Sequence, residues 1–388
     1  MTVNVSKPVV NVREKLAELD KPTGIAGEAM LRADTVPDQA ELLGYRQQNV
    51  LINGAMQVAQ RGNLTGHTSG NSYGAVDRWG LNLGSSVGTW KLEQGTGTNA
   101  FANSVKATCT TAGSVSASDF VVLNQRLEGQ NLFAFNKGTS DAKHFTLSFW
   151  VKASVAGTYS CELNDQDNTR YSGHAYTVNQ ADTWEYKVLV FSPDTTGAFG
   201  DDNNSSLQVS WWIGAGSNYT SGTITNGKWH TTTVNRVADL VNMYTTVNST
   251  FELTGVQLVA GNYPDGLPFM HRSYGEELAL CQRYYTRMTH SSAGRSFAVG
   301  GADSATASVY VVALPQTLRA NPQITTSNVN IRQLGSSTNL TISSISAISH
   351  TSGIVNLHGN VASGFTAGTP TRLRANAVGA YIEFKAEL

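Results

Sequence analysis

Aromatic side chains that lie near carboxylates and amides are the residues of this chain whose chemistry is easiest to assign. A sugar is held by a flat ring that packs against its C–H groups and by planar polar side chains that hydrogen-bond its hydroxyls. Trp211 and Trp212 are adjacent in an alternating segment, so their rings must point to opposite faces, and only one of them can be a surface platform. The alternative for each of these aromatic residues is packing in a core. Our candidate glycan contacts, where strands meet polar loops, are Trp212, Tyr219, Trp229, Tyr176 and Asp202.

Two acidic, Asn-rich segments offer oxygen atoms that could bind Ca²⁺. These are DQDN (165–168) and GDDNNSS (200–206). Neither has the spacing of an EF-hand, and turns rich in Asp, Asn and Gly also form for backbone reasons alone. We therefore expect no metal and no other cofactor, with a structural Ca²⁺ ion as the alternative.

Paired carboxylates are also the machinery of glycosidases, which hold two acids about 5–10 Å apart across a cleft. Asp201 and Asp202 are instead neighbours in a polar loop, where water solvates both. The chain has no GxSxG, HExxH or GxxxxGK[ST] motif, and its eight histidines are scattered. We expect no enzymatic activity, and glycan degradation is the weakest of the alternatives.

A helical run, RSYGEELALCQRYYTRM, interrupts the second half of the chain. Leu278, Cys281 and Tyr285 share one face of the predicted helix, which indicates packing. Acidic residues fall in its first turn and arginines near its end, an arrangement that stabilises a helix without any chemistry. No general base stands at a recognisable spacing from Cys281, so we expect a packing thiol within a linking helix over 272–289.

Most of the chain beyond residue 47 alternates apolar and polar residues in the manner of β-strands. The segments 145–154, 184–191, 206–216 and 251–261 each show this period of two, and each is bounded by Gly, Asn, Asp or Pro. The expected fold is mostly β. We predict an antiparallel β-sandwich (jelly roll) over 48–271, the linking helix, and a smaller C-terminal β-domain over 290–388.

Residues 1–47 differ from the rest because they are charge-rich and carry short amphipathic helical patches. Such a segment buries too little to fold alone. We expect an N-terminal arm that docks on another protein or bundles with copies of itself, and a loosely ordered arm is the alternative.

The overall composition argues against several partners. The net charge is −1 and only 14% of residues are charged, against roughly 25% in an ordinary domain, so we expect no nucleic-acid binding. No apolar run reaches the ~18 residues of a membrane helix, and the first residues lack the apolar core of a signal peptide. We expect synthesis in a cytoplasm, without membrane insertion. Three widely spaced cysteines, with no CxxC pair, are expected to be buried thiols.

Several stretches resemble a domain of bacteriophage tail-fibre and related virion proteins. NVLINGAMQVAQRG (49–62) followed by YGAVDRWGL (73–81) resembles its opening. The strand-rich middle is similar to its carbohydrate-binding-module-like jelly roll, and LTGVQLVAGNYPDGLPFMHRSYGEELALCQRYY (253–285) resembles its close. The last residues, AYIEFKAEL, are similar to the C-terminal β-region. The chain departs from this pattern at Met270 and His271, where the family has an acidic residue after Pro-Phe.

The resemblance implies a tail-fibre-like virion appendage protein, located in the phage particle. It implies attachment to other virion structural proteins through residues 1–47, a homotrimer, and binding to host surface polysaccharide during adsorption. A purely structural virion component (a head fibre, decoration or tail accessory protein) stays open as an alternative. Exposed aromatic side chains favour binding, whereas aromatic side chains that are all buried favour a spacer.

Overall fold

The computed structural model describes residues 48–98, 100–114, 116–237 and 240–388. The predicted N-terminal arm, residues 1–47, lies outside these residues. The residues from Asn49 to Leu388 form one compact unit. In the described part of the chain, no helix has the length and apolar character needed to span a membrane.

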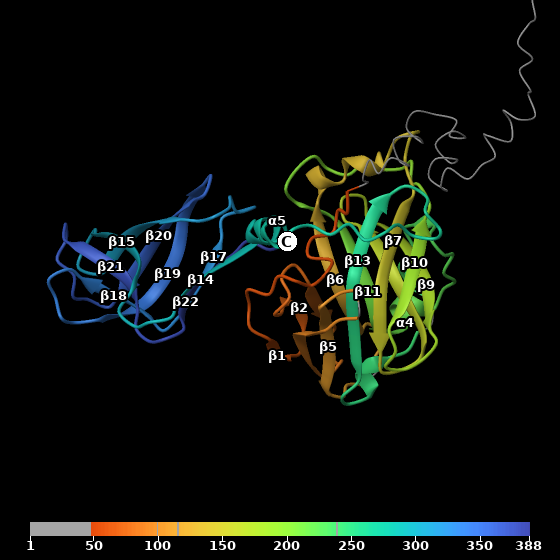
Figure 1. The fold of residues 1–388 in the computed structure, drawn as a ribbon, viewed down its shortest axis with the longest axis horizontal. Coiled ribbons are helices and arrows are strands. Elements are labelled where there is room, and N and C mark those ends of the chain that lie inside the picture. The colour runs from red at the N-terminus through yellow and green to blue at the C-terminus, as the bar shows by residue number, and fades with distance from the viewer. Residues whose placement is uncertain (1–47, 99, 115, 238–239) are drawn as a thin grey trace, which may run out of the picture. The chain divides into compact units, whose positions relative to one another are not determined.

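Two antiparallel sheets pack into a β-sandwich (Figure 1). The chain passes repeatedly between the sheets, as in a jelly roll. One sheet has six strands in the order β1 (Leu64–His67), β4 (Thr89–Thr96), β5 (Asn103–Thr111), β13 (Thr250–Ala260), β7 (Phe145–Ala153) and β10 (Glu185–Phe191). The other has seven, in the order β12 (Trp229–His230), β9 (Arg170–Val178), β8 (Gly157–Asp165), β11 (Ser205–Ala215), β6 (Phe120–Glu128), β3 (Gly80–Leu83) and β2 (Gly70–Tyr73).

The core of the sandwich lies between the inner faces of the two sheets. In β7 the apolar residues alternate with polar ones, so Phe149 and its apolar neighbours point inward. Trp211 is fully buried and lies 5.4 Å from Trp79 and 5.6 Å from Phe149, measured between ring centroids. Short helical turns border the sheets: α4 (Ser217–Thr220) and the 3-10 helices Gly129–Asn131, Phe133–Phe135, Thr233–Asn235 and Met243–Thr245.

A second, smaller β-region follows, with its own apolar cluster. It combines a three-stranded sheet with a closed six-stranded barrel, and the prediction of a mostly β fold with a sandwich and a smaller β-domain is confirmed. The sheet has the order β14 (Tyr285–His290), β22 (Ala380–Lys385) and β17 (Gln323–Ser327). The barrel has the order β15 (Ser296–Ala302), β16 (Ala307–Ala313), β20 (Ile354–Val361), β19 (Leu340–Thr351), β18 (Val329–Gln333) and β21 (Pro370–Ala375).

Helix α5 (Tyr274–Gln282) is shorter than the predicted linking helix. Ser273 and Glu276 form a capping box at its start. The helix ends at Gln282, and residues predicted to be helical after it form β14, because Tyr285 to His290 pair with β22. The packing role of Cys281 is confirmed: its thiol is buried with Ile52 and Val58. Cys109 and Cys161 are buried free thiols as well.

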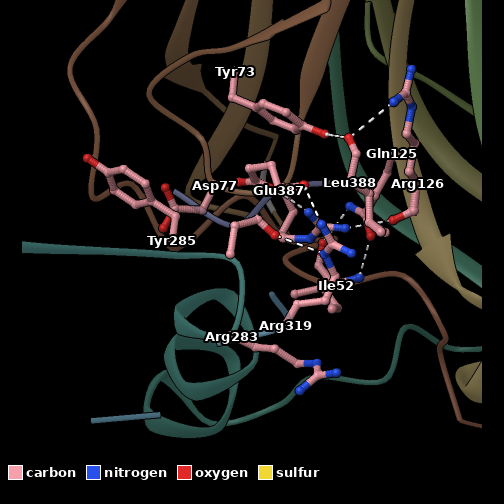
Figure 2. A network of polar contacts seen from close by, with 12 residues as sticks. Ile52, Tyr73, Asp77, Gln125, Arg126, Arg283, Tyr285, Arg319, Glu387 and Leu388 are labelled. Atoms are coloured by element: carbon pink, nitrogen blue, oxygen red, sulfur yellow. Dashed lines mark hydrogen bonds and ion pairs between the residues drawn. The ribbon is translucent and has the colours of Figure 1, made fainter. Parts of the chain in front are cut away.

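A polar network joins the end of the chain to the sandwich (Figure 2). Glu387 forms ion pairs with Arg61, at 2.6 Å, and with Arg78. Tyr73 and Arg126 donate hydrogen bonds to the carbonyl oxygen of Leu388, at 3.0 and 3.1 Å. The contacts of this network fix the three-stranded sheet against the sandwich.

Candidate functional site

The outer face of the six-stranded sheet carries an aromatic pair, an exposed Tyr186 and a half-buried Trp150. Trp150 on β7 and Tyr186 on β10 are directly opposite each other in the strand register. Because neighbouring residues Phe149 and Val151 point into the core, the alternation of the strand turns Trp150 outward. The two rings lie 5.4 Å apart at 45°, and Tyr186 is 41% exposed. β13 and β7 lie side by side here (Figure 1).

A bulge in β13 builds the floor beside this pair. The register of β13 against β7 shifts between Thr254 and Gln257. Gly255 lies in this bulge with φ +58°, and a Cβ atom there would come within 2.5 Å of the Phe101 ring and 3.1 Å of Trp150. The absence of a side chain therefore allows Phe101 to lie directly over the strand.

The chain after β13 folds back and forms the second wall. Gln257 holds this segment by accepting a hydrogen bond from the Met270 amide, at 2.8 Å. Phe269 packs edge-on against Phe101 at 4.9 Å, and His271 stacks on Phe101 at 5.6 Å, measured between ring centroids. His271 and Phe269 thus form an aromatic wall beside Phe101.

These walls enclose a groove of about 340 Å³, which we call the aromatic groove. Its lining contains no Asp, Glu, Lys or Arg, and its polar side chains are those of Ser148, Tyr186 and His271. Flat rings with a few hydroxyl and imidazole groups suit a neutral ligand that has both C–H faces and hydroxyls. The lining residues are Ala100, Phe101, Ser148, Trp150, Tyr186, Gly255, Leu267, Pro268, Phe269 and His271.

The candidates from the sequence lie elsewhere. Trp212 and Tyr219 come together on the outer face of the other sheet, with ring centroids 5.1 Å apart. Arg236 packs over both rings and forms an ion pair with Glu162 at 2.6 Å. Trp212 is only 3% exposed, because Val237 and other residues of the same apolar cluster cover it. Trp211 and Trp212 do point to opposite faces, but the assignment of Trp212 as a surface platform is corrected.

The other three candidates do not join that pair. Tyr176 is buried in the core against Phe149, so its assignment to a surface site is corrected. The period-two alternation places Tyr176 on the inner face of β9. Trp229 is half-buried, and its Nε1 donates to the carbonyl of Ser192 at 2.9 Å. Asp202 is exposed and accepts two hydrogen bonds from Asn204, which stabilise its own turn.

The side chain of Lys137 binds the carboxylate of Asp165, the first residue of the DQDN loop. The Lys137 Nζ lies 2.5 Å from Asp165 Oδ2 and 3.2 Å from Asp194 Oδ2, and it donates to the Gly197 carbonyl at 2.6 Å. All three charged side chains are buried, at 4% exposure or less. In the described residues, no group of three or more His, Cys, Asp and Glu side chains could hold a metal ion. The first acid of the proposed Ca²⁺ loop is therefore the partner of an ammonium group.

Sequence reasoning missed the aromatic groove, although one signal was visible. In the segment 145–154, Trp150 falls among the outward positions, with Thr146, Ser148 and Lys152. A large aromatic residue on the polar side of an alternating strand indicates an exposed ring. Phe101, Tyr186 and Phe269 give no such signal, because only the register and the folded-back segment bring them to Trp150.

The fold and groove define an antiparallel β-sandwich with a ligand-sized hollow on one outer face. No family model matches the chain, and no curated protein sequence matches it. Among solved structures, the N-terminal cellulose-binding domain of Cellulomonas fimi β-1,4-glucanase C is similar, at 11% identity and a TM-score of 0.30 over 56% of this chain and 99% of that one.

Two further structures are similar at the same level. The family 11 carbohydrate-binding module from Clostridium thermocellum, in complex with a β-1,3-1,4-mixed-linked tetrasaccharide, is 12% identical with a TM-score of 0.26, over 52% of this chain and 98% of that one. The enzymatically active domain of bacteriophage CBA120 tailspike protein 4 is 12% identical with a TM-score of 0.28, over 55% of this chain and 21% of that one. No conclusion about function rests on these similarities.

Proposed function

We propose that this chain is a tail-fibre-like virion appendage protein that binds host surface glycans in the aromatic groove. The observation that carries the binding part is the outward-facing pair of Trp150 and Tyr186 in a hollow of about 340 Å³. Outward-facing rings on a hydrogen-bonded sheet can stack on sugar C–H faces without a large loss of side-chain entropy. The lining lacks Asp, Glu, Lys and Arg, which favours a neutral saccharide.

The virion part of the proposal is supported by the sequence resemblance and not by the groove. In this proposal residues 1–47 attach the chain to other virion structural proteins, and three copies assemble. The protein is made in the host cytoplasm and incorporated into the particle, and it acts by binding without catalysis. Cryo-electron microscopy of the particle, with residues 1–47 traced to their neighbours, tests the attachment and the trimer together.

The glycan-binding part predicts that Tyr186→Ala weakens binding of the full-length protein to isolated host surface polysaccharide. Loss of an aromatic platform at a binding site costs about tenfold or more in affinity. Isothermal titration calorimetry measures the change, and Trp150→Ala should act in the same direction. Tyr274→Ala is the matched control, because Tyr274 is an exposed tyrosine outside the groove at 56% exposure.

Equal affinity of Tyr186→Ala, Trp150→Ala and the wild type would remove the groove from the proposal. No binding of wild-type protein to host cells or to their polysaccharide would overturn the receptor role altogether. That result would favour a structural spacer, and one observation already favours it: Trp212 and Tyr176 are buried. Release of reducing ends from the polysaccharide would instead favour a glycan-degrading tailspike.

A further inference from the structure

A second, chemically different hollow lies where the three-stranded sheet meets the first strands of the sandwich. Its volume is about 770 Å³, within the range of ligand pockets, about 300–1,000 Å³. We call it the junction pocket. Its lining is mostly polar and includes Arg61, Tyr73, Arg287, Gln323, Glu383 and Glu387.

The alternation of β22 produces one wall of the junction pocket. Ile382 and Phe384 point into the apolar cluster of the C-terminal region. Tyr381, Glu383 and Lys385 therefore point to the opposite face and line the pocket. The neighbouring strands add Arg287, which is opposite Glu383, and Gln323, which is opposite Lys385. This wall belongs to a hydrogen-bonded sheet and is rigid.

Both carboxylates of the lining already have partners within the protein. Glu387 forms ion pairs with Arg61 and Arg78. Glu383 forms an ion pair with Lys385 at 3.0 Å and accepts a hydrogen bond from the Tyr285 hydroxyl at 2.7 Å. Each carboxylate of the pocket is thus paired with a neighbouring cation.

Arg287 is different from the other cations of the junction pocket. Its guanidinium lies over the Tyr381 ring, with Cζ 3.8 Å from the centroid, and its buried Nε has no hydrogen-bond partner. Among the residues that the structure describes, Arg287 forms no ion pair with a carboxylate. Because the Nε is buried, an anion would be bound by the terminal nitrogens of this half-buried guanidinium, which is held on an aromatic ring in a ligand-sized pocket and has no carboxylate partner among the described residues.

The other side chains of the pocket indicate which class of molecule carries the anionic group. Asn63, Asn71 and Gln323 supply amide donors and acceptors, and Tyr73 and Tyr381 supply rings. Amides suit a ligand rich in hydroxyls, because each hydroxyl both donates and accepts. We infer that the junction pocket binds an acidic saccharide, with the sugar carboxylate on the Arg287 guanidinium and the hydroxyls on the neighbouring amides.

Calorimetric titration of the full-length protein with trigalacturonate tests the inference, and the fully methyl-esterified trisaccharide is the matched ligand without charge. We expect trigalacturonate to bind and the ester to bind at least about tenfold more weakly, the range expected for loss of a charged hydrogen bond. Arg287→Gln should weaken trigalacturonate binding by a similar factor. Arg295→Gln is the control, because Arg295 is exposed on a turn outside the pocket.

A second variant keeps the test independent of any folding defect in Arg287→Gln. Gln323 is exposed, so Gln323→Ala should fold normally and weaken trigalacturonate binding several-fold. Tyr274→Ala, at an exposed residue outside both hollows, should leave trigalacturonate binding unchanged. Equal binding of the acid and its ester, equal binding by wild type and Arg287→Gln, or no binding at all would each overturn the inference. Displacement of trigalacturonate by equimolar inorganic phosphate would overturn the saccharide assignment and show a general anion site.

Discussion

At the scale of single residues, the buried charges of the sandwich are each matched to a specific partner. Lys137 connects Asp165 on β8 with Asp194 in the loop after β10, and it also binds two backbone carbonyls of that loop. The ammonium group thus fills an oxygen cluster that, in sequence, also suited Ca²⁺. The composition of a loop could not distinguish these occupants, because the lysine lies far away along the chain.

Asp77 is a second buried charge, and it should make stability depend on pH. Burial raises the pKa of Asp77 to about 6, although Arg61 and Gln60 oppose this shift. Because the pKa is higher in the folded state, the folded protein binds the proton more tightly, and the free energy of unfolding falls as pH rises from about 4 to about 6. A rise of the Asp77 pKa from 3.8 to about 6 corresponds to about 3 kcal/mol.

We therefore predict that Asp77→Asn gains stability relative to wild type as the pH is raised from 4 to 7, by up to about 3 kcal/mol. Urea unfolding at a series of pH values measures the difference. Asp141→Asn, which removes an exposed carboxylate, serves as the control. A difference between Asp77→Asn and wild type that stays constant across this range would contradict the prediction.

At the scale of elements, the bulge of β13 links the strand register to the shape of the aromatic groove. The shift between Thr254 and Gln257 places a residue with positive φ under Phe101, and only glycine adopts that conformation without strain next to the ring. The same bulge turns Gln257 outward, where it fixes the Met270 amide. The bulge of β13 thus positions both Phe101 and the folded-back segment that contains Met270.

Gly255→Ala should lower the free energy of unfolding by about 1–3 kcal/mol, because it adds backbone strain and displaces Phe101. It should also weaken glycan binding in the groove. Thermal unfolding and calorimetric titration measure the two effects. Gly301→Ala is a matched control, since a Cβ at Gly301 on β15 meets nothing within 4 Å. Equal stability of the two variants would show that the bulge tolerates a side chain.

At the scale of the whole described unit, the sandwich and the C-terminal region are joined by charged groups and by the small apolar cluster around Cys281. The sandwich and the C-terminal region each bury a separate cluster. Between them, Arg78 is fully buried, stacks on Tyr284 at 3.5 Å and pairs with Glu387. Arg319 adds hydrogen bonds to the carbonyls of Ala386 and Asn203, at 3.0 and 3.1 Å. These polar contacts therefore couple the unfolding of the two parts, together with the apolar cluster of Ile52, Val58 and Cys281.

Glu387→Ala should destabilise the protein by about 3–5 kcal/mol, because it leaves the buried guanidinium of Arg78 without its counter-charge. Differential scanning calorimetry should then show the sandwich and the C-terminal region melting in two transitions. Glu93→Ala removes a more exposed pair with Lys91 and should change stability by less than about 1 kcal/mol. A single transition at the wild-type temperature in Glu387→Ala would contradict this role.

Sequence patterns were sufficient to predict the features that depend only on residues close together in the chain. The alternation in 145–154 predicted β7 and its inner face, the spacing around Cys281 predicted a packing thiol, and the adjacent Trp211 and Trp212 had to diverge. The end of the helix was harder to predict, because pairing with β22, almost 100 residues later, makes Tyr285 the start of a strand. Local charges alone favoured a longer helix.

The sequence by itself determined the mostly β fold, because a period of two is a property of each strand and needs no knowledge of its partner. It also determined the low net charge and the absence of a basic excess. Only the tertiary structure decided which rings are covered and which are exposed. Trp212 is buried, whereas Trp150 is left partly exposed by the strand register, a bulge and a folded-back segment. Whether a ring is exposed depends on contacts with residues distant in sequence, and such contacts exist only in the folded chain.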